Sequence, residues 1–372
     1  MALRTLSGKH IDPRKGRGAA INPEGRFEKV EREAYDDGWM HDESDDERAL
    51  ITQIVEEKAA SIISRNQSPD IPFTQSINPY QGCEHGCIYC YARPTHAYRN
   101  LSPGVDFETR IFAKVNAAEL LRKELARPGY VCDVISLGAN TDPYQPAERK
   151  LNITRGILEV CAEFNQPVGI ITKNALVERD LDILAPMAEK KLVNVFLSIN
   201  NLDHEIARRL EPRCVAPQRR IDAIRTLSQA GVPVGVLVAP VIPFLTDDQI
   251  EAVLEAAFEA GATQAGYVVL RLPYEVKTLF RDWLERHYPL KAKHVMSRVH
   301  ELRGGRDNDP NFGSRMRGQG EFAELLSKRF EIAKRRIGYD ARNRMLRNTS
   351  LDTTQFRVPA PAPTETQQMS LF

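Results

Sequence analysis

Short apolar runs, rich in β-branched residues, alternate with amphipathic segments through the middle of this chain. The apolar runs are 131–137, 168–172, 193–199, 234–242 and 265–270. Strands that are apolar on both faces, joined by helices with one apolar stripe, are typical of parallel strands covered by helices. With a first strand expected in 72–80, the alternation predicts an α/β fold of about six β/α units, which is a partial (β/α)6 TIM-type barrel. An open doubly wound sheet is the alternative.

Three residues stand where helices should end, just before the next strand: Asn165, Gly231 and Gly261. Glycine and asparagine favour the left-handed conformation that ends a helix. In a barrel of this type the chemistry lies at the C-terminal ends of the strands. The residues that follow each apolar run are therefore the candidates for a functional site.

The 372 residues suffice for one large domain with extensions. We expect a polar, partly disordered N-terminal extension, a core domain, a basic helical extension and a disordered tail, at 1–70, 71–290, 291–347 and 348–372. Helical patterns occur outside the core at 50–64, 291–302 and 319–337. The tail is rich in Pro, Ala and Thr, so it has too little apolar surface to offset the entropy of ordering.

The composition excludes some classes of protein. Hydrophobic residues make up 42% and charged residues 27% of the chain, as in globular proteins. No run of about 18 apolar residues is present, so we expect no membrane span. The N-terminus lacks the apolar stretch of a secretory signal, which predicts a cytoplasmic protein. The basic stretch 291–347 predicts contact with phosphates of nucleic acid, while ordinary solvated surface is the alternative.

Three of the six cysteines form a C-x3-C-x2-C motif at Cys83, Cys87 and Cys90. Thiolates are the soft ligands that iron–sulfur clusters and zinc select, and such a cluster in a cytosolic chain indicates metal rather than disulfides. A structural zinc site needs four protein ligands, and only His85 could complete the set locally. Three thiolates on a four-iron cluster leave one iron open to the amino and carboxylate groups of S-adenosylmethionine (SAM). The sequence therefore predicts a [4Fe-4S] cluster and SAM as cofactors, and a zinc site is the alternative.

The motif, with aromatic Tyr89 before its last cysteine, resembles the radical SAM signature. A wider pattern resembles the spore photoproduct lyase-like, or DNA repair photolyase-like, branch of that superfamily, and it comprises 76–80, 82–93, 140–146, 172–173, 211–213 and 239–243. Residues 16–19 and 22–27 resemble one uncharacterised bacterial subfamily of this branch. The resemblance covers roughly 15–345. It implies a partial barrel of the radical SAM type and an enzyme that cleaves SAM to a 5′-deoxyadenosyl radical.

The resemblance also implies roles for residues at strand ends. Cys83, Cys87 and Cys90 would be the catalytic cluster ligands. Residues that would contact SAM follow the later strands, and they are Asn140, Thr141, Asp142, Lys173, Ser198 and Asn200. Apart from the resemblance, Tyr89 beside the cluster could stack the adenine of SAM, and Arg213 could hold SAM or substrate. Lys173 could pair with the SAM carboxylate, and Ser198 and Asn200 could bind ribose hydroxyls. Turn formation, packing and a salt bridge within a loop are the competing explanations for these residues.

The sequence departs from the family at one position. Spore photoproduct lyase carries a hydrogen-donor cysteine just before its Ser/Thr-Asp-Pro turn, where this chain has Ala139 or Asn140. Cys132 lies at the far end of that strand, and we expect Cys161 in the core and Cys214 in a loop. Reversal of thymine dimers by the route of that lyase is therefore not predicted.

The function that we predict is a radical SAM enzyme that acts on nucleic acid, with lyase-like chemistry of the DNA repair kind. A radical SAM enzyme that modifies a protein or small molecule, and a non-catalytic metal-binding module, are the alternatives. A reductant such as flavodoxin or ferredoxin would supply the electron. The last residues, from Gln368 to Phe372, resemble the Gln-x-x-Leu-Phe peptide that docks on the bacterial DNA sliding clamp.

Overall fold

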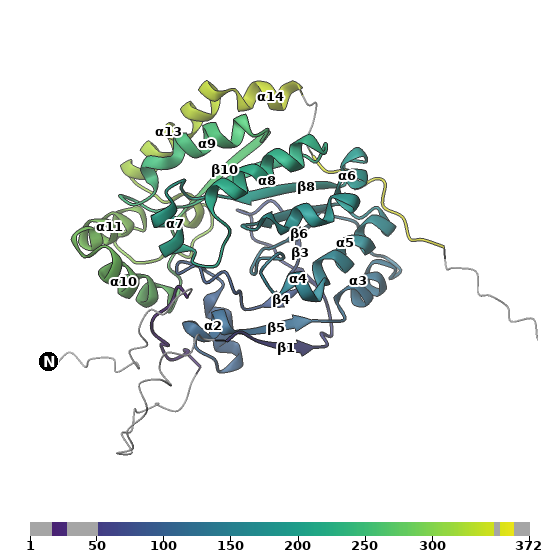
Figure 1. The fold of residues 1–372 in the computed structure, drawn as a ribbon, viewed down its shortest axis with the longest axis horizontal. Helices are drawn as coiled ribbons and strands as arrows, with labels where there is room; N and C mark the ends of the chain where they lie inside the picture. The colour runs from purple at the N-terminus through teal and green to yellow at the C-terminus, as the bar shows by residue number, and fades with distance from the viewer. Residues whose placement is uncertain (1–16, 28–50, 346–349, 361–372) are drawn as a thin grey trace, which may run out of the picture.

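A mixed seven-stranded sheet forms the centre of the computed structural model, which describes residues 17–27, 51–345 and 350–360 (Figure 1). The strand order is β10-β9-β8-β7-β6-β3-β2. The strands are β2 (Ile63–Arg65), β3 (Gln75–Ile77), β6 (Ile135–Leu137), β7 (Val168–Thr172), β8 (Val193–Ser198), β9 (Val234–Val241) and β10 (Gln264–Val269). All neighbours from β3 to β10 pair in parallel, and β2 runs antiparallel to β3. The predicted series of six parallel strands is therefore confirmed, and β2 and β10 remain the edges of the sheet.

Helices cover the sheet because each of them turns an apolar stripe toward it. The connecting helices are α3 (Ala117–Leu125), α5 (Ile153–Phe164), α6 (Leu181–Glu189), α8 (Pro217–Gln229) and α9 (Ile250–Glu259). Their buried residues join those of the strands in one core. Asn165, Gly231 and Gly261 have positive φ values of 49°, 78° and 108°, as expected for residues that end helices.

Shorter elements lie in the connections. They are η1 (Arg93–Arg99), α2 (Val105–Thr109), α4 (Glu148–Leu151), η2 (Ala175–Asp180), α7 (His204–Leu210) and η3 (Asp247–Gln249). The C-terminal helices are α10 (Val276–His287), α11 (Pro289–Leu302), α12 (Ser314–Arg317), α13 (Glu321–Ile337) and α14 (Tyr339–Met345). No helix of the described residues is both long and apolar enough to cross a membrane.

A second, three-stranded sheet corrects the predicted helical pattern at 50–64. In this sheet β1 (Gln53–Glu57) pairs in parallel with β5 (Arg110–Lys114), and β4 (Tyr80–Gln81) pairs with the other side of β5. Residues 63–65 form strand β2 of the main sheet. The residues of β1 are mostly exposed, so the spacing of their apolar side chains does not correspond to a buried helix face. Backbone pairing with a distant partner determines the structure of this segment.

Residues 350–360 correct part of the predicted disordered tail. This segment runs past the ends of α5 and α6 (Figure 1). The ring of Phe356 lies 5.2 Å from that of Tyr130 and 6.2 Å from that of Phe164, between ring centroids. The backbone N–H of Arg357 donates to the Phe164 carbonyl at 2.9 Å. One aromatic side chain and a few backbone bonds thus hold a segment whose composition is otherwise that of a disordered chain.

Candidate active site

The cysteine motif forms a tight loop directly after β4. Gly82 and Gly86 have φ values of +85° and +67°, in the left-handed region that glycine adopts without strain. Within the loop, the Gly86 N–H donates to the Cys83 carbonyl at 3.3 Å, and the Cys90 N–H donates to the Cys87 carbonyl at 3.2 Å. The chain therefore makes two consecutive turns between Cys83 and Cys90, and the three cysteines lie on one compact loop.

The three thiols lie close enough to influence one another. Burial raises the pKa of Cys90 to about 12, and the Cys87 and Cys83 thiols contribute to that increase. In the part of the chain that the structure describes, no group of three or more His, Cys, Asp or Glu side chains is placed to hold a single metal ion.

His85, the residue that could complete a zinc site, contacts side chains beyond the cysteine loop. Its Nδ1 lies 3.3 Å from Asp142 Oδ2, and its Nε2 lies 3.3 Å from the side-chain nitrogen of Asn174. Burial opposes a charge on His85, but Asp142 and Cys83 raise its pKa well above the ordinary value. His85 thus anchors the cysteine loop to the ends of β6 and β7.

Asp142, one of the predicted SAM contacts, is the centre of this anchor. Its Oδ1 accepts the Thr172 hydroxyl at 2.6 Å, and its Oδ2 accepts the Lys173 N–H at 2.7 Å. Burial would raise the pKa of Asp142, yet His85 and these donors hold it at about 2. Since protein groups occupy both oxygens, the geometry gives Asp142 the task of joining two strand ends.

Asn140 and Thr141 follow β6 at the same edge of the sheet. The Asn78 side-chain oxygen accepts the Asn140 N–H at 2.8 Å, and the Thr141 hydroxyl donates to the Tyr80 carbonyl at 2.9 Å. Thr141 is buried by these contacts, whereas Asn140 is exposed. Of the two, Asn140 has the side chain that can reach a ligand.

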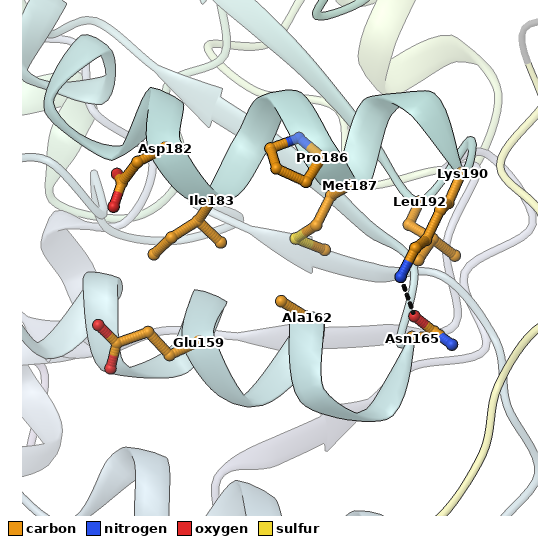
Figure 2. A pocket seen from close by; sticks show the side chains of 9 residues that line it. All are labelled: Glu159, Ala162, Asn165, Asp182, Ile183, Pro186, Met187, Lys190 and Leu192. Atoms are coloured by element: carbon orange, nitrogen blue, oxygen red, sulfur yellow. Dashed lines mark hydrogen bonds between the residues drawn. The ribbon is translucent and has the colours of Figure 1, made fainter.

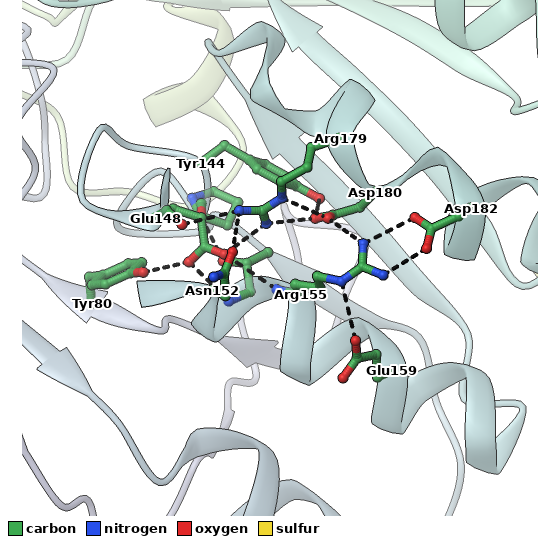
Figure 3. Close-up of polar contacts among 11 residues, drawn as sticks. Tyr80, Tyr144, Glu148, Asn152, Arg155, Glu159, Arg179, Asp180 and Asp182 are labelled. Atoms are coloured by element: carbon green, nitrogen blue, oxygen red, sulfur yellow. Dashed lines mark hydrogen bonds and ion pairs between the residues drawn. The ribbon is translucent and has the colours of Figure 1, made fainter. Parts of the chain in front are cut away.

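A buried polar network supports the loop that carries these residues (Figure 3). The Tyr80 hydroxyl donates to Glu148, which also forms an ion pair with Arg179 at 2.9 Å. Arg179 and Arg155 both contact Asp180, at 2.8 and 3.1 Å. The network ties β4, α4 and η2 together beneath the strand ends.

Lys173 directly follows β7 and faces the cysteine loop. Its ammonium lies 6.0 Å from the centroid of the Tyr89 ring. Burial would lower the pKa of Lys173, but the thiols of Cys87 and Cys214 and the carboxylates of Glu211 and Asp142 raise it. A lysine held in its charged form beside the thiols is suited to bind a carboxylate.

The end of β8 retains one unused donor. The Ser198 hydroxyl donates to the Ala239 carbonyl at 3.1 Å, and the Asn200 side-chain oxygen accepts from Asn201 at 2.7 Å. The side-chain nitrogen of Asn200 is buried and has no hydrogen-bond partner in the described residues. A buried donor without a partner is costly, which favours a ligand at this position.

The loop after α7 packs directly against the cysteines. Glu211 accepts the Tyr89 hydroxyl and forms a fully buried ion pair with Arg220. Arg213 pairs instead with Glu84 at 3.1 Å, and its side chain is exposed. Cys214, predicted to lie in a loop, has its sulfur 3.8 Å from that of Cys87.

Two further residues, Arg93 and Glu108, hold the other side of the loop. Arg93 is completely buried and donates to the carbonyls of Cys87 and Gly86, at 2.9 and 3.0 Å. It also pairs with buried Glu108 at 2.6 Å. Glu108 in turn accepts the backbone N–H groups of Gly18 and Ala19, at 2.9 and 2.8 Å. No local pattern marks Glu108, because its partners come from two segments, 17–19 and η1, that lie apart from it in the chain.

A surface groove between α5 and α6 is unrelated to this site. It has a volume of about 280 Å³ and is lined by residues such as Ile183, Met187 and Ala162 (Figure 2). Lys190 closes one end by donating to the Asn165 side chain at 3.2 Å. None of the predicted cofactor contacts lines it.

Comparisons with known proteins show which family and fold the chain is similar to. The Radical SAM superfamily model matches residues 77–257. An uncharacterized protein of Mycobacterium tuberculosis is 39% identical over 234 residues, which cover 62% of this chain and 68% of that protein. An uncharacterized protein of Methanocaldococcus jannaschii is 27% identical over 237 residues, which cover 64% of this chain and 84% of that protein.

The fold is similar to solved structures of spore photoproduct lyase. A cysteine-to-serine mutant of that enzyme matches with a TM-score of 0.54 and 16% identity, over 76% of this chain and 79% of that chain. A double mutant with bound AdoMet and dinucleoside spore photoproduct matches with a TM-score of 0.53 and 15% identity, over the same shares of each chain. At this level of identity the likeness concerns the fold.

Proposed function

The chain belongs to the radical SAM superfamily, and from this premise we propose that Cys83, Cys87 and Cys90 hold a [4Fe-4S] cluster that acts on SAM. Enzymes of this superfamily use such a cluster and SAM, and when bound the pair supplies a 5′-deoxyadenosyl radical. The observation that carries the proposal is the loop of three thiols at the strand ends, with His85 turned to Asp142 and Asn174.

The protein groups around the loop have separate tasks in this proposal. Lys173 binds the carboxylate of SAM as a point charge, and the free donor of Asn200 meets a ribose hydroxyl. The exposed side chain of Asn140 provides a further contact with SAM. Asp142, Glu211 and Arg93 hold strand ends and loops in place and exclude water from the site. Arg213, which pairs with Glu84, acts at the rim and contacts SAM only if that pair opens.

The proposed substrate is nucleic acid, and the proposed chemistry is lyase-like. The likeness in fold to spore photoproduct lyase, solved with a dinucleoside spore photoproduct, supports it. The basic extension 291–347 supports it less, because several of its cations pair with carboxylates, such as Arg329 with Glu251 and Arg336 with Glu255. A protein or small molecule is the second candidate substrate.

Anaerobic reconstitution tests the proposal. The wild-type protein should bind iron and sulfide, and with dithionite and SAM it should form methionine and 5′-deoxyadenosine. Cys87→Ala should lose both properties, whereas Cys132→Ser, a matched change of a half-buried thiol remote from the motif, should keep them. Retained 5′-deoxyadenosine formation in Cys87→Ala would overturn the assignment. A panel of damaged and normal nucleic acids, and flavodoxin or ferredoxin in place of dithionite, would then identify substrate and donor.

We also propose that the last five residues dock on a DNA sliding clamp, although Gln368 to Phe372 lie outside the described residues. Residues 350–360 are fixed to the core by Phe356. The seven residues from 361 to 367 can therefore span at most about 24 Å, which would keep the enzyme close to the clamp. Deletion of Leu371 and Phe372 should abolish retention on an immobilised clamp, and equal retention would refute the idea.

A further inference from the structure

Arg271, just beyond the C-terminal end of β10, carries a charge that forms no ion pair within the described residues. Its Nε is buried and has no hydrogen-bond partner in the described residues. Its Nη1 lies 3.6 Å from the sulfur of Met316, which is a weak acceptor. No carboxylate among the described residues forms an ion pair with it. Burial lowers the pKa of Arg271 and the nearby Arg315 lowers it further, whereas Tyr91 and the more distant carboxylate of Asp70 raise it.

The surroundings of Arg271 add positive charge. Arg303 is buried and donates to the backbone carbonyls of Val269 and Ser314, at 3.0 and 3.1 Å, so it ties the end of β10 to the start of α12. Arg315 also lies near Arg271, and it forms an ion pair with the carboxylate of Asp70. Cations withdrawn from water without counter-ions are costly, so the arrangement favours an anionic ligand.

Tyr91 links this charge to the cysteine loop. The guanidinium carbon of Arg271 lies 5.5 Å from the centroid of the Tyr91 ring, and Tyr91 directly follows Cys90. The Tyr91 hydroxyl donates to the Ala139 carbonyl, beyond the end of β6. Tyr91 therefore spans the distance between two strands, β6 and β10, that are not neighbours in the sheet. Lys173 lies at the end of β7, so the proposed SAM carboxylate site and Arg271 are on different strands.

Exposed aromatic rings accompany the unpaired arginine. Tyr91 is 47% exposed and Phe312 is 58% exposed, and the guanidinium of Arg315 lies 4.6 Å from the centroid of the Phe312 ring. Aromatic faces next to an arginine fork are the features with which proteins bind single-stranded nucleic acid, by base stacking and by two hydrogen bonds to one phosphate.

We propose that Arg271 binds a phosphodiester group of a single-stranded or extruded nucleic-acid segment, with a base against the exposed face of Tyr91. The inference rests on the proposed function and names the subsite that would present the substrate to the cluster loop. The phosphate would accept from the Nε and from one terminal nitrogen of Arg271. It would thereby satisfy the buried donor that has no partner among the residues the structure describes.

Anaerobic binding of a short fluorescent thymidine oligonucleotide, titrated at several salt concentrations, tests the subsite. Arg271→Gln should weaken binding about tenfold or more and reduce the slope of log K against log salt by about one. Arg271→Lys should recover part of the affinity and part of the salt slope, since lysine restores the positive charge but not the paired donors of the guanidinium. Arg122→Gln, which removes an exposed arginine paired with Glu163, is the matched control and should bind like the wild type.

A neutral methylphosphonate, placed at each linkage in turn, makes the test specific. At one linkage it should weaken binding to the wild type and have no further effect on Arg271→Gln. Iron content and circular dichroism of each variant show that the cluster and fold persist. Equal binding by wild type and Arg271→Gln, or no binding by the wild type, would overturn the inference. Cleavage of SAM by the wild type without oligonucleotide, measured separately, reports on the proposed function alone.

Discussion

The sulfur atoms of Cys87 and Cys214 lie 3.8 Å apart, although the two residues are 127 positions apart in the chain. One belongs to the proposed cluster motif and the other to the loop after α7. Without iron, these two thiols need only a small movement to form a bond. We predict that dioxygen converts them to a disulfide in cluster-free protein, with the two hydrogen atoms passing to the oxygen.

Mass spectrometry of cluster-free protein digested without reductant should show a peptide that joins Cys87 to Cys214. Reconstitution should then require prior treatment with dithiothreitol. Cys214→Ser removes the partner thiol, so this variant should take up iron after exposure to air without that treatment. If the variant and the wild type need the reductant equally, the disulfide has no part in assembly.

Local patterns in the sequence predicted the main sheet because each β/α unit carries its own information. Apolar runs specify strands buried on both faces, and Asn165 and Gly231 end their helices by their own backbone preference. The pairing of β1 with β5 has no such signature, because the two segments are far apart in the chain and β1 is mostly exposed. The contact between Phe356 and Phe164 also joins segments that are far apart in the chain, so no local pattern predicts it.

The site shows a similar division between local and distant information. The cysteine spacing identifies the loop, since all three thiols lie within one short stretch of sequence. The identity of a strand-end residue does not reveal what its side chain contacts. Asp142 is occupied by Thr172 and Lys173, and Arg213 by Glu84, and these pairings exist only once distant strand ends and loops have met.

His96 should make the stability depend on pH. Its Nε2 lies 3.0 Å from the Arg110 carbonyl, its Nδ1 is buried without a partner in the described residues, and burial lowers its pKa to about 4. The unfolded chain binds a proton near pH 6.5 and the folded one does not, so stability is lost as the pH falls from about 6.5 toward 4. At a pH of about 5.5 the loss should be about 1.4 kcal/mol.

Urea unfolding of the anaerobic protein at pH values of about 7.5 and about 5.5 measures this loss. The His96→Gln variant has no group that titrates there, so the stability gap between wild type and variant should shrink by that amount at the lower pH. A gap that stays constant between the two pH values would show that His96 is protonated to the same extent in both states.

The buried pair of Glu211 and Arg220 should be sensitive to the loss of one partner. Their side chains are 0% and 1% exposed, and Glu211 also accepts the Tyr89 hydroxyl. Arg220→Met would leave a buried carboxylate without its counter-ion, at an expected cost of about 3–5 kcal/mol in the free energy of unfolding. Arg122→Met breaks the exposed pair with Glu163 and should cost less than about 1 kcal/mol. Similar urea midpoints for the two variants would contradict this reading.

Gly18 should be required to cover the cysteine loop. A Cβ at this position would lie 1.9 Å from the carbonyl oxygen of Gly86, which is far inside contact distance. Gly18→Ala must therefore move residues 17–27 away from the loop and weaken the bonds from Gly18 and Ala19 to Glu108. Since this segment covers one side of the motif, we expect the cluster to decay several-fold faster in air, at a cost of about 1–3 kcal/mol in stability.

The visible absorbance of the reconstituted cluster, followed after admission of air, measures the decay. Gly156→Ala is the matched control, because Gly156 lies within α5, where an added Cβ would approach only the Ala118 side chain, at 3.4 Å. Alanine favours a helix more than glycine does, so this variant should lose its cluster no faster than the wild type. An unchanged decay in Gly18→Ala would mean that residues 17–27 do not protect the cluster, whereas faster decay in both variants would point to general destabilisation.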